Sequence, residues 1–357
     1  MSAKTLGNKI ISGPHVGAPL QTYQIMRQVV WALLPACGVG VFLFGWPALY
    51  LLGVTVASAL LVEAACLKLR GLPVLPTLND GSALVTGLLT AMTLPPWAPW
   101  WIGVTGSAIA IALGKQVYGG LGQNLFNPAM LARVALLISF PIEMTRWTNI
   151  EPLFTGPGLA ESWRITFGGQ EISDAMTGAT TLGLVKTGFS LNQTLPNLLA
   201  DHSNWLSFLG WERGSLGETS SLVLFITGIG LWRKNIIQWH APGSLLGTVF
   251  ILALIGHLLN PGRYLDPWTH LNSGALILIA FFIATDYVTS PNTPLGQMIF
   301  GAGCGVLIYI IRAWGGYPEG SGFAILLMNA VTPLIDHYIK PRIYGRYRNG
   351  KPLDISH

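Results

Sequence analysis

The stretch TLPPWAPWWIGVTGSAIAIALGKQVYGGLGQNLFNPAMLARVAL, residues 93–136, decides the fold, because much of its pattern returns near the other end of the chain. There, residues 289–334 read TSPNTPLGQMIFGAGCGVLIYIIRAWGGYPEGSGFAILLMNAVTPL. Prolines, glycine pairs and apolar residues match in the same order: Pro95 with Pro291, Gly119-Gly120 with Gly315-Gly316, and, after a slip of one residue, Phe126 with Phe323 and Val134 with Val331. Upstream, DGSAL (80–84) echoes NSGAL (272–276) at a slightly different offset. Several matches in one order indicate an internal duplication.

The composition around these repeats is that of an integral membrane protein. Of the 357 residues, 51% are hydrophobic and only 10% are charged, whereas ordinary soluble domains carry about 25% charged residues. Residues 1–19 contain no apolar core before a small-residue cleavage site, so we expect a cytoplasmic tail and no cleaved signal peptide. The net charge of +5 lies mostly in the tails and short loops, which indicates membrane orientation and not binding to nucleic acid.

Ten stretches are candidates for crossing the bilayer, which requires about 20 mostly apolar residues. Several are short or interrupted by Gly and Pro. We expect spans at residues 26–44, 46–66, 80–95, 100–118, 124–142, 219–233, 243–260, 270–286, 296–313 and 321–338. Five spans per repeat is an odd number, so the two repeats must insert with opposite orientations. Inverted repeats with interrupted helices usually form a shared site near the bilayer midplane, as in a transporter, a channel or a protein that re-uses such a scaffold.

The basic residues set the orientation, because cytoplasmic segments are enriched in Lys and Arg. Most basic clusters fall on one side if both termini are cytoplasmic, and Arg263 and Arg312 are the exceptions. This orientation places the acidic residues 143–218 outside. The chain then divides into a cytoplasmic tail with the first five-helix repeat (1–142), a periplasmic loop (143–218), the second five-helix repeat (219–338) and a cytoplasmic tail (339–357).

Metal, thiol and nucleotide chemistry have no support in the residues. Cys37, Cys66 and Cys304 lie far apart in apolar segments without a C-x-x-C spacing, as expected of small buried hydrophobes. The seven histidines form no H-x-x-x-H pair, and no phosphate-binding Gly-rich loop is present. We therefore predict no metal ligand and no catalytic residue in this chain.

The stretch DAMTGATTLG, residues 174–183, lies in the acidic outer loop and raises the question of function. One interpretation is a capped turn, in which a Thr hydroxyl accepts from a following amide and a short helix TLGLVK follows. A Thr hydroxyl is a weak nucleophile without an adjacent base, so self-modification is not expected. A second enzyme could attach a group to it. A phosphate there would lie near a helix N-terminus, where amides and the helix dipole favour it.

The pattern D-x-x-[ST]-G-A-T in an outer loop resembles the flavinylation motif of the family formed by the membrane subunits RnfD and NqrB. In that family a flavin transferase joins FMN by a phosphoester to the last threonine of the motif. The resemblance carries this role to Thr180. The residues that match the motif are Asp174, Thr177, Gly178, Ala179 and Thr180. Thr181 departs from the pattern, because the family often has proline there. The stretches NDGSALVTGLLTAMTLPP (79–96), GGLGQNLFNPAM (119–130) and GSLGETS (214–220) also resemble the family's membrane signatures, so the resemblance covers nearly the whole chain.

The resemblance implies a redox subunit of a larger complex. The short stretch before the first span favours the RnfD branch, because NqrB chains tend to carry a longer N-terminal extension. Members of this branch belong to the ion-translocating ferredoxin:NAD⁺ oxidoreductase (Rnf) complex of the bacterial inner membrane. The implied partners are the lipid bilayer, the flavin transferase, a periplasmic FMN subunit and the cytoplasmic subunits that face NADH and ferredoxin. The family's fold is similar to that of urea channels, which agrees with the inverted repeats.

The resemblance also implies a non-covalent riboflavin in the membrane part, where a hydrocarbon core about 30 Å thick is too wide for one useful electron-tunnelling step. We expect it near GQNLFNPAM, since Asn124 and Asn127, at i and i+3, would share a helix face and their amides can bind an isoalloxazine edge. The alternative is that Asn127-Pro128 only breaks a helix and Asn124 caps it. Lys115 is a further candidate flavin contact, or a lysine that snorkels to the surface.

Ionisable groups near the spans are candidates for ion coupling, because charge in a membrane is costly and tends to be functional. The set comprises Glu63, Arg133, Glu218, Asp286, Arg312 and Asp336. Glu218 in GSLGETS and Asp286, which opens the loop after the eighth span, lead this set.

The sequence therefore predicts an all-α polytopic membrane subunit that passes electrons between riboflavin and covalent FMN, coupled within a complex to Na⁺ or H⁺ movement. It has no NAD or ferredoxin site and no complete active site of its own. Three alternatives stay open: an NqrB-type subunit of a Na⁺-translocating NADH:quinone oxidoreductase, a stand-alone channel for a small neutral solute such as urea, and a purely structural scaffold.

Overall fold

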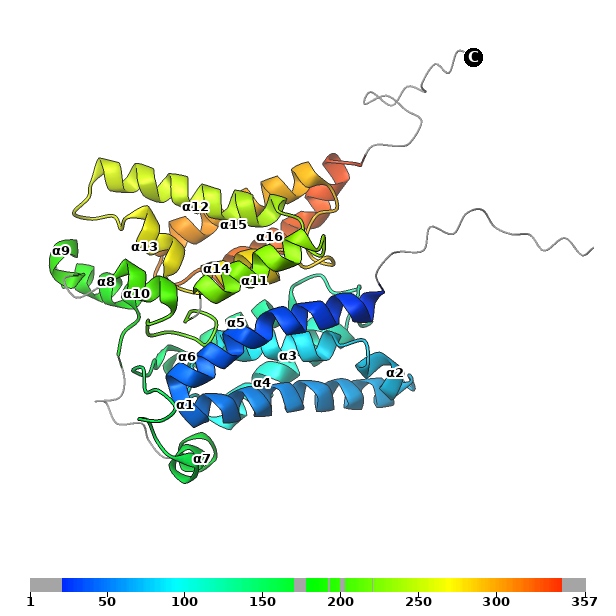
Figure 1. Cartoon of the computed structure of the whole chain (residues 1–357). Helices are drawn as coiled ribbons and strands as arrows, with labels where there is room; N and C mark the ends of the chain where they lie inside the picture. The colour runs from blue at the N-terminus through cyan, green and yellow to red at the C-terminus, as the bar shows by residue number, and fades with distance from the viewer. Residues whose placement is uncertain (1–20, 170–177, 192, 200–202, 220, 342–357) are drawn as a thin grey trace, which may run out of the picture.

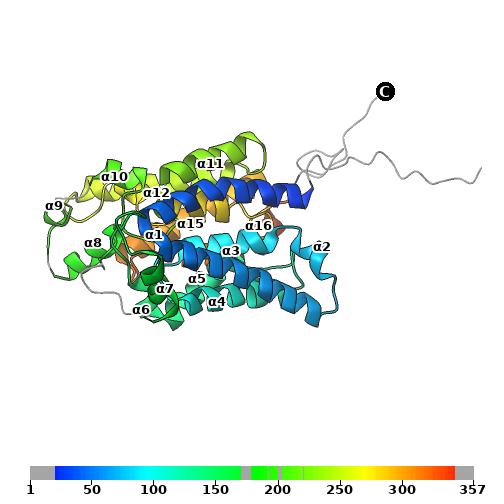
Figure 2. The ribbon, with the colours of Figure 1, turned by 60° about the horizontal axis from the view of Figure 1, so that its bottom comes forward.

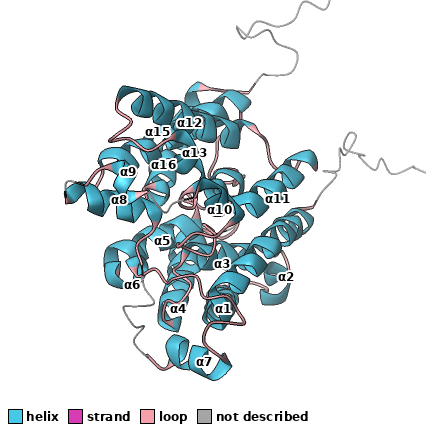
Figure 3. Ribbon diagram, turned by 60° about the vertical axis from the view of Figure 1, so that its left-hand side comes forward, coloured by secondary structure: helices cyan, strands magenta, loops and turns pink. Residues whose placement is uncertain are grey.

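The structure, a computed structural model, describes residues 21–341 except 170–177, 192, 200–202 and 220. Within this part of the chain the fold is entirely helical, without a β-strand (Figure 3). The expected all-α class is thus confirmed. Two residues of the predicted flavin motif, Asp174 and Thr177, lie outside the described residues.

The first half of the chain forms one bundle. Its elements are α1 (Thr22–Leu69), α2 (Val74–Leu78), α3 (Ser82–Thr93), α4 (Trp100–Ala108) with its π-helical continuation η1 (Ile109–Gln116), α5 (Pro128–Ser139) and α6 (Pro141–Thr145). α1 contains both of the first two expected spans as two helical segments joined by a kink. At the kink, Gly45 with φ 73° breaks the helical backbone, and Pro47 follows it. A left-handed φ carries no steric cost for glycine, so the bend has a cause in the sequence.

The second half forms a second bundle beside the first (Figure 1). Its elements are α11 (Ser221–Arg233), α12 (His240–Leu259), α13 (Pro267–Asn272), α14 (Leu276–Leu278) with its π-helical continuation η3 (Ile279–Ile283), α15 (Pro294–Trp314) and α16 (Ser321–Tyr338). Four short helices connect the bundles: α7 (Leu159–Phe167), α8 (Thr181–Ser190), α9 (Leu195–Leu198) and α10 (Asn204–Leu209). One buried apolar core runs through both bundles, with Met92 from the first and Phe281 from the second. Cys37 and Cys304 are buried in this core as free thiols, as expected.

The two ends of the molecule differ. α8, α9 and α10 lie at one end in Figure 1, whereas the start of α1 and the end of α16 lie at the opposite end. The rotated view keeps α8 and α9 apart from the start of α1 (Figure 2). The described ends of the chain therefore share one side of the molecule, away from α8.

The helices are those of a polytopic membrane protein, although some are shorter than expected. By length and composition, α1, α12 and α15 can each cross a membrane, and α3, α5 and α11 are shorter apolar helices. Spans were expected at 80–95 and 124–142, but α3 and α5 have only 12 residues each, about 18 Å at the usual helical rise. Gly81 precedes α3 and Pro95 follows it, while Pro128 and Pro141 bound α5. Proline lacks the amide that an interior helical position needs.

In each bundle, a glycine with a left-handed backbone separates two consecutive helices. Gly81 (φ 79°) separates α2 from α3, and Gly274 (φ 73°) separates α13 from α14. These glycines belong to the echoing sequences DGSAL and NSGAL. The echo therefore marks the same backbone feature in both halves.

A buried cation reaches each interruption from a later helix of the same bundle. Nζ of Lys115, in η1, donates to Oγ of Ser82 at the start of α3 (2.6 Å). Nη2 of Arg312, in α15, donates to the carbonyl of Ser273 at the end of α13 (2.8 Å). An interrupted helix needs side chains that satisfy its freed backbone groups. Arg312 does so for the Ser273 carbonyl, whereas Lys115 contacts the side chain of Ser82.

Candidate functional site

Thr180, the predicted attachment residue, is the N-cap of α8. Its backbone is extended (φ −67°, ψ 159°), and its Oγ1 accepts a hydrogen bond from the amide of Gly183 (3.2 Å). The expected capped turn and the helix after it are confirmed. Because α8 has 10 residues, its first-turn amides and its dipole place partial positive charge at Thr180. A phosphate joined to this hydroxyl would lie where an anion is favoured.

Gly178 provides the space in which a cation approaches the motif. Its amide donates to the carbonyl of Trp147 (2.9 Å), which ties the segment to the loop before α7. A Cβ at Gly178 would lie 2.6 Å from Nη1 of Arg213 and 3.0 Å from Oδ1 of Asn149. The glycine of the motif therefore lets the Arg213 guanidinium lie against the backbone two residues before Thr180.

α8 is fastened to the second bundle by Lys186. Its Nζ donates to the carbonyl of Ile311 (3.0 Å) and to the carbonyls of Gly315 and Tyr317. These acceptors lie at and after the C-terminal end of α15, where backbone carbonyls lack helical partners. Partial burial lowers the pKa of Lys186 below its usual value, because the ammonium loses hydration. Lys186 thereby holds the helix that begins at Thr180 in a fixed position.

We expect Lys186→Met to loosen α8 without unfolding the bundles. The substitution removes hydrogen bonds from a charged donor, each of which contributes about 1.5–3 kcal/mol. Limited chymotrypsin digestion should therefore cut faster within α8 (Thr181–Ser190), at a rate several times that of wild type, and no faster within α12. Lys234→Met, which changes an exposed lysine after α11, is the matched control. Equal cleavage of Lys186→Met and wild type would contradict the anchoring role.

A cavity of about 580 Å³, part of it open to solvent, lies next to Thr180, and we call it the Thr180 cavity. Apolar and aromatic side chains form one part of its wall: Leu137, Met144, Trp147, Leu182 and Tyr317. Charged side chains form the other part: Arg133, Glu212, Glu218 and Glu319. The predicted attachment residue therefore lies at a space with one apolar side and one charged side.

Arg133 on α5 is the centre of the charged wall. Its Nη2 lies 2.7 Å from Oε2 of Glu319 and 3.8 Å from Oε1 of Glu218. Its Nη1 donates to the carbonyl of Thr93 at the end of α3 (2.6 Å). Arg133 thus joins the first bundle to Glu319, which lies between α15 and α16. The sequence singled out Arg133 and Glu218 as separate candidates but missed Glu319, whose one signal is its place in the Gly-rich interruption WGGYPEGSG.

Arg312 on α15 makes the matching connection in the second bundle. Its Nη1 donates to the carbonyl of His270 (2.6 Å) and its Nη2 to that of Ser273 (2.8 Å). Nη2 also lies 3.8 Å from Oε1 of Glu319, and this oxygen accepts from the amide of Ala275 (2.7 Å). Arg312 departs from the orientation rule for basic residues because its charge belongs to this buried network and not to a loop.

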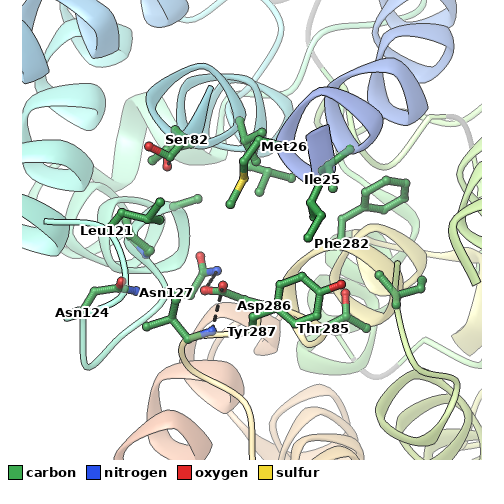
Figure 4. A pocket seen from close by; sticks show the side chains of 18 of the residues that line it. Ile25, Met26, Ser82, Leu121, Asn124, Asn127, Phe282, Thr285, Asp286 and Tyr287 are labelled. Carbon is green, nitrogen blue, oxygen red and sulfur yellow. Dashed lines mark hydrogen bonds between the residues drawn. The ribbon is translucent and has the colours of Figure 1, made fainter. Parts of the chain in front are cut away.

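A second pocket, here the inter-bundle pocket, lies between α1, α3, η1 and α5 of the first bundle and α11 and η3 of the second (Figure 4). Its empty volume is about 810 Å³, including the part open to solvent. Lys115, Asn124, Asn127 and Asp286 all line it. The structure therefore brings the three predicted riboflavin residues together with one of the two leading ion-coupling candidates. The other candidate, Glu218, lines the Thr180 cavity instead.

The inter-bundle pocket lies toward the end of the molecule opposite α8. Ile25 and Met26, near the start of α1, line it (Figure 4), and the start of α1 lies away from α8 (Figure 1). Its wall is mostly apolar, with side chains such as Phe282 and Leu121 facing the same space as the few polar groups (Figure 4). Apolar walls with a few convergent polar groups are typical of cofactor pockets.

Asn127 connects the two bundles at this pocket. Its Nδ2 donates to Oδ2 of Asp286 (3.3 Å; Figure 4), and its Oδ1 accepts from the amide of Met130 as the N-cap of α5 (3.2 Å). The expected helix face shared by Asn124 and Asn127 is wrong, because α5 begins only at Pro128. Asn127, and not Asn124, is the cap. Both nevertheless reach the same pocket, since the turn before α5 folds along it.

Lys115 does not snorkel to the surface. It is only 2% exposed, and its Nζ lies 2.7 Å and 2.8 Å from the carboxylate oxygens of Glu63 and 2.6 Å from Oγ of Ser82. Two of the predicted residues thus form a buried ion pair beside the inter-bundle pocket. The remaining candidate, Asp336, accepts hydrogen bonds from Asn292 at an exposed position (3.0 Å and 3.1 Å).

Comparison with known proteins bears directly on these features. The model of the NQR2, RnfD, RnfE family matches residues 9–345. The D subunit of an ion-translocating oxidoreductase complex from Halorhodospira halophila is 51% identical over 352 residues, which cover 98% of this chain and 99% of the relative. The D subunits of such complexes from Stutzerimonas stutzeri and Escherichia fergusonii are 52% and 41% identical, over 92% and 96% of this chain and 94% and 99% of their own lengths. The resemblance inferred from the TGAT motif and the membrane signatures is confirmed: the chain belongs to the NQR2, RnfD, RnfE family.

Proposed function

We propose that this chain is the electron-carrying membrane subunit of an ion-translocating ferredoxin:NAD⁺ oxidoreductase complex, with FMN joined by a phosphoester to Thr180 and riboflavin bound non-covalently. One observation carries the proposal: the last threonine of the TGAT motif caps α8 and lines a cavity with a charged wall. Relatives of nearly equal length are named as the D subunit of an ion-translocating oxidoreductase complex. A channel or a structural scaffold would leave this threonine with its capping role alone.

The residues around Thr180 fit a flavin phosphate. The N-terminal amides of α8 favour an anion at its cap, and Arg213 lies against the neighbouring Gly178. A bound flavin supplies one-electron and two-electron chemistry, while the protein supplies binding, orientation and charge. Here Arg133 holds a positive charge at the wall of the cavity, and Lys186 holds α8 in place.

The inter-bundle pocket suits the riboflavin. Asn124 and Asn127 can donate and accept hydrogen bonds at its polar edge, and the apolar walls can enclose a planar ring. Lys115 is already held by Glu63, so its role there is to support the wall of the pocket. A carrier at this end and another at the α8 end would divide the path across a hydrocarbon core about 30 Å thick.

The proposed topology has ten spans in two inverted repeats, both termini in the cytoplasm and the flavin loop in the periplasm of a bacterial inner membrane. The separation of α8 from the described chain ends supports this orientation (Figure 1). The glycine-interrupted helix in each bundle supports the inverted repeats.

Partners must supply the rest of the reaction. The proposed complex contributes a periplasmic FMN subunit and cytoplasmic subunits that face NADH and ferredoxin, and a flavin transferase attaches the FMN. Glu218 and Asp286 are the candidates for coupling electron flow to Na⁺ or H⁺. An NqrB-type subunit is the alternative, and a quinone-reductase assay on the intact complex separates the two. A stand-alone urea-like channel would instead conduct the solute in liposomes.

The test of the proposed function is the fluorescence of the chain on a denaturing gel. The wild-type protein is made with and without the flavin transferase in the same host. We expect a fluorescent band, and a mass increase matching one FMN phosphoester, only when the transferase is present. A dark band despite an active transferase would reject covalent FMN and leave the channel or the scaffold.

Leu121→Trp is expected to displace riboflavin from the inter-bundle pocket. Leu121 lines the pocket and is 38% exposed, so a larger ring fills the space without an enclosed clash. The riboflavin released on denaturation, relative to covalent FMN, should fall to about a tenth or less, which corresponds to about 1.4 kcal/mol of binding free energy. Leu125→Trp changes a similarly exposed neighbour outside the pocket lining (42%) and should keep its riboflavin. Equal riboflavin in both variants would place the cofactor elsewhere.

A further inference from the structure

We propose that Glu218 takes up a proton when the flavin on Thr180 is reduced, and that Arg133 and Glu319 position Glu218 for this role. The inference rests on the proposed attachment of FMN to Thr180. It goes further by naming the coupled ion, its acceptor and the residues that hold the acceptor in place.

The first observation is that Thr180 and Glu218 line one cavity. Glu218 is only 5% exposed, so its carboxylate is shielded from bulk water. A new charge in such a space is costly unless a nearby group neutralises it. A flavin tethered to Thr180 would gain its charge within reach of this carboxylate.

The second observation is the charge balance of the network. Two guanidinium groups, Arg133 and Arg312, face two carboxylates, Glu218 and Glu319, and Glu212 is a third carboxylate at the cavity wall. One electron delivered by a one-electron carrier of the complex adds one negative charge to the cavity. One proton taken from a hydronium ion of the solvent offsets this charge: one O–H bond breaks in the hydronium ion, which leaves as water, and one forms on a carboxylate oxygen of Glu218. A metal cation would need several oxygen ligands and would meet the two guanidinium groups.

The third observation separates the two carboxylates. Both carboxylate oxygens of Glu319 have close partners, because Arg133 lies 2.7 Å from one oxygen and the amide of Ala275 donates to the other (2.7 Å). Glu218 lies 3.8 Å from Arg133 and accepts one hydrogen bond from the hydroxyl of Ser215 (2.9 Å). Its charge is therefore the less stabilised of the two. Arg133 makes its shorter contact with Glu319, and this leaves Glu218 able to bind a proton.

The backbone also holds Glu218 in this position. A Cβ at Gly214 would lie 2.3 Å from Oε2 of Glu218, so the glycine lets the side chain fold back over its own segment. The charged groups that face Glu218 are Arg133 from α5, Glu319 after α15, Arg312 from α15 and Glu212 from its own segment. Glu212 is the one other carboxylate near enough in the described residues to compete for the proton, and the test includes it.

The experiment counts protons taken up per electron during electrochemical reduction of the purified, flavin-loaded protein, with a pH-indicator dye in weakly buffered detergent. We expect wild type to take up one more proton per covalent flavin than Glu218→Gln at the same pH. Glu161→Gln, which changes an exposed carboxylate on α7, is the matched control and should behave as wild type. In Glu319→Gln, Arg133 can turn to Glu218 and keep it ionised, so the extra proton should be taken up only at lower pH. Glu319→Asp should restore the wild-type behaviour.

Each other outcome overturns the proposal. Equal proton uptake by Glu218→Gln and wild type, with covalent flavin in both, removes Glu218 as the acceptor. Loss of the proton in Glu212→Gln alone assigns it to Glu212. Unchanged proton uptake with Na⁺-dependent reduction points to a metal cation. If Glu218→Gln does not fold, Glu319→Gln provides the test. The proposal is rejected if this variant takes up the extra proton at the same pH as wild type. A wild-type band that is dark on the denaturing gel means instead that the proposed function has failed.

Discussion

Thr180→Asn is expected to abolish the covalent flavin while leaving α8 capped. Asparagine is at least as good an N-cap as threonine, so its side-chain oxygen can replace Oγ1 as the acceptor for the amide of Gly183. It has no hydroxyl, and no phosphoester can form. In protein made with the flavin transferase, the fluorescence of the band on a denaturing gel should fall to background. Thr180→Val is less informative, because it also removes the cap at a cost of about 1 kcal/mol.

The neighbouring threonine provides the control for this result. Thr181 is the first residue of α8 and follows Thr180 directly, and it lines a pocket together with Ala179 and Arg213. Thr181→Val should keep full fluorescence, because the motif ends at Thr180. Thr180→Ser retains both the hydroxyl and the cap, and it tests whether the transferase requires the methyl group. A fluorescent Thr180→Asn band, or a dark Thr181→Val band, would contradict the assignment.

The features that the sequence predicted well are local ones. The capped turn in the TGAT stretch, the helix after it and the boundary between the expected spans 26–44 and 46–66 each depend on a few adjacent residues, and short-range hydrogen bonds or glycine geometry produce them. The membrane helices follow from runs of apolar residues. The lengths of α3 and α5 were predicted less well, because hydropathy continues across Pro95 and Asn127-Pro128 although the helical backbone does not.

The sequence could not show which charges meet. Arg133 and Glu319 are 186 residues apart, and Lys115 and Glu63 are 52 residues apart. Each is a single charge in an apolar or Gly-rich segment, and no periodicity links one segment to the other. Only the packing of the two bundles shows that Arg133, Arg312, Glu218 and Glu319 form one network near Thr180. The sequence predicted Asn124 and Asn127 as neighbours in one site, and both line the inter-bundle pocket. The helix face expected for them does not exist, because α5 begins at Pro128.

The second large effect is expected at the buried ion pair of Lys115 and Glu63. Glu63 is 0% exposed, and both of its carboxylate oxygens lie within 2.8 Å of Nζ of Lys115. Lys115→Met removes the cation and leaves a buried carboxylate with Gln116 as its one hydrogen-bond donor among the residues that the structure describes (2.8 Å). Removing one partner of a buried pair typically destabilises a protein by about 3–5 kcal/mol. Equilibrium unfolding in detergent micelles should show a loss of this size, whereas Lys68→Met, at an exposed position of the same α1 end, should change little.

The double variant separates the structural role of Lys115 from a role in binding riboflavin. Lys115→Met with Glu63→Gln has no unpaired charge, so most of the lost stability should return, as replacement of whole buried pairs by neutral groups is often nearly neutral. If Lys115 only supports the wall of the inter-bundle pocket, riboflavin should return together with the stability. If the stability returns and the riboflavin does not, Lys115 contacts the flavin itself. The double variant could instead be as unstable as Lys115→Met alone. The lost stability would then come mainly from the hydrogen bond between Nζ of Lys115 and Ser82 at the start of α3, and not from the unpaired carboxylate of Glu63.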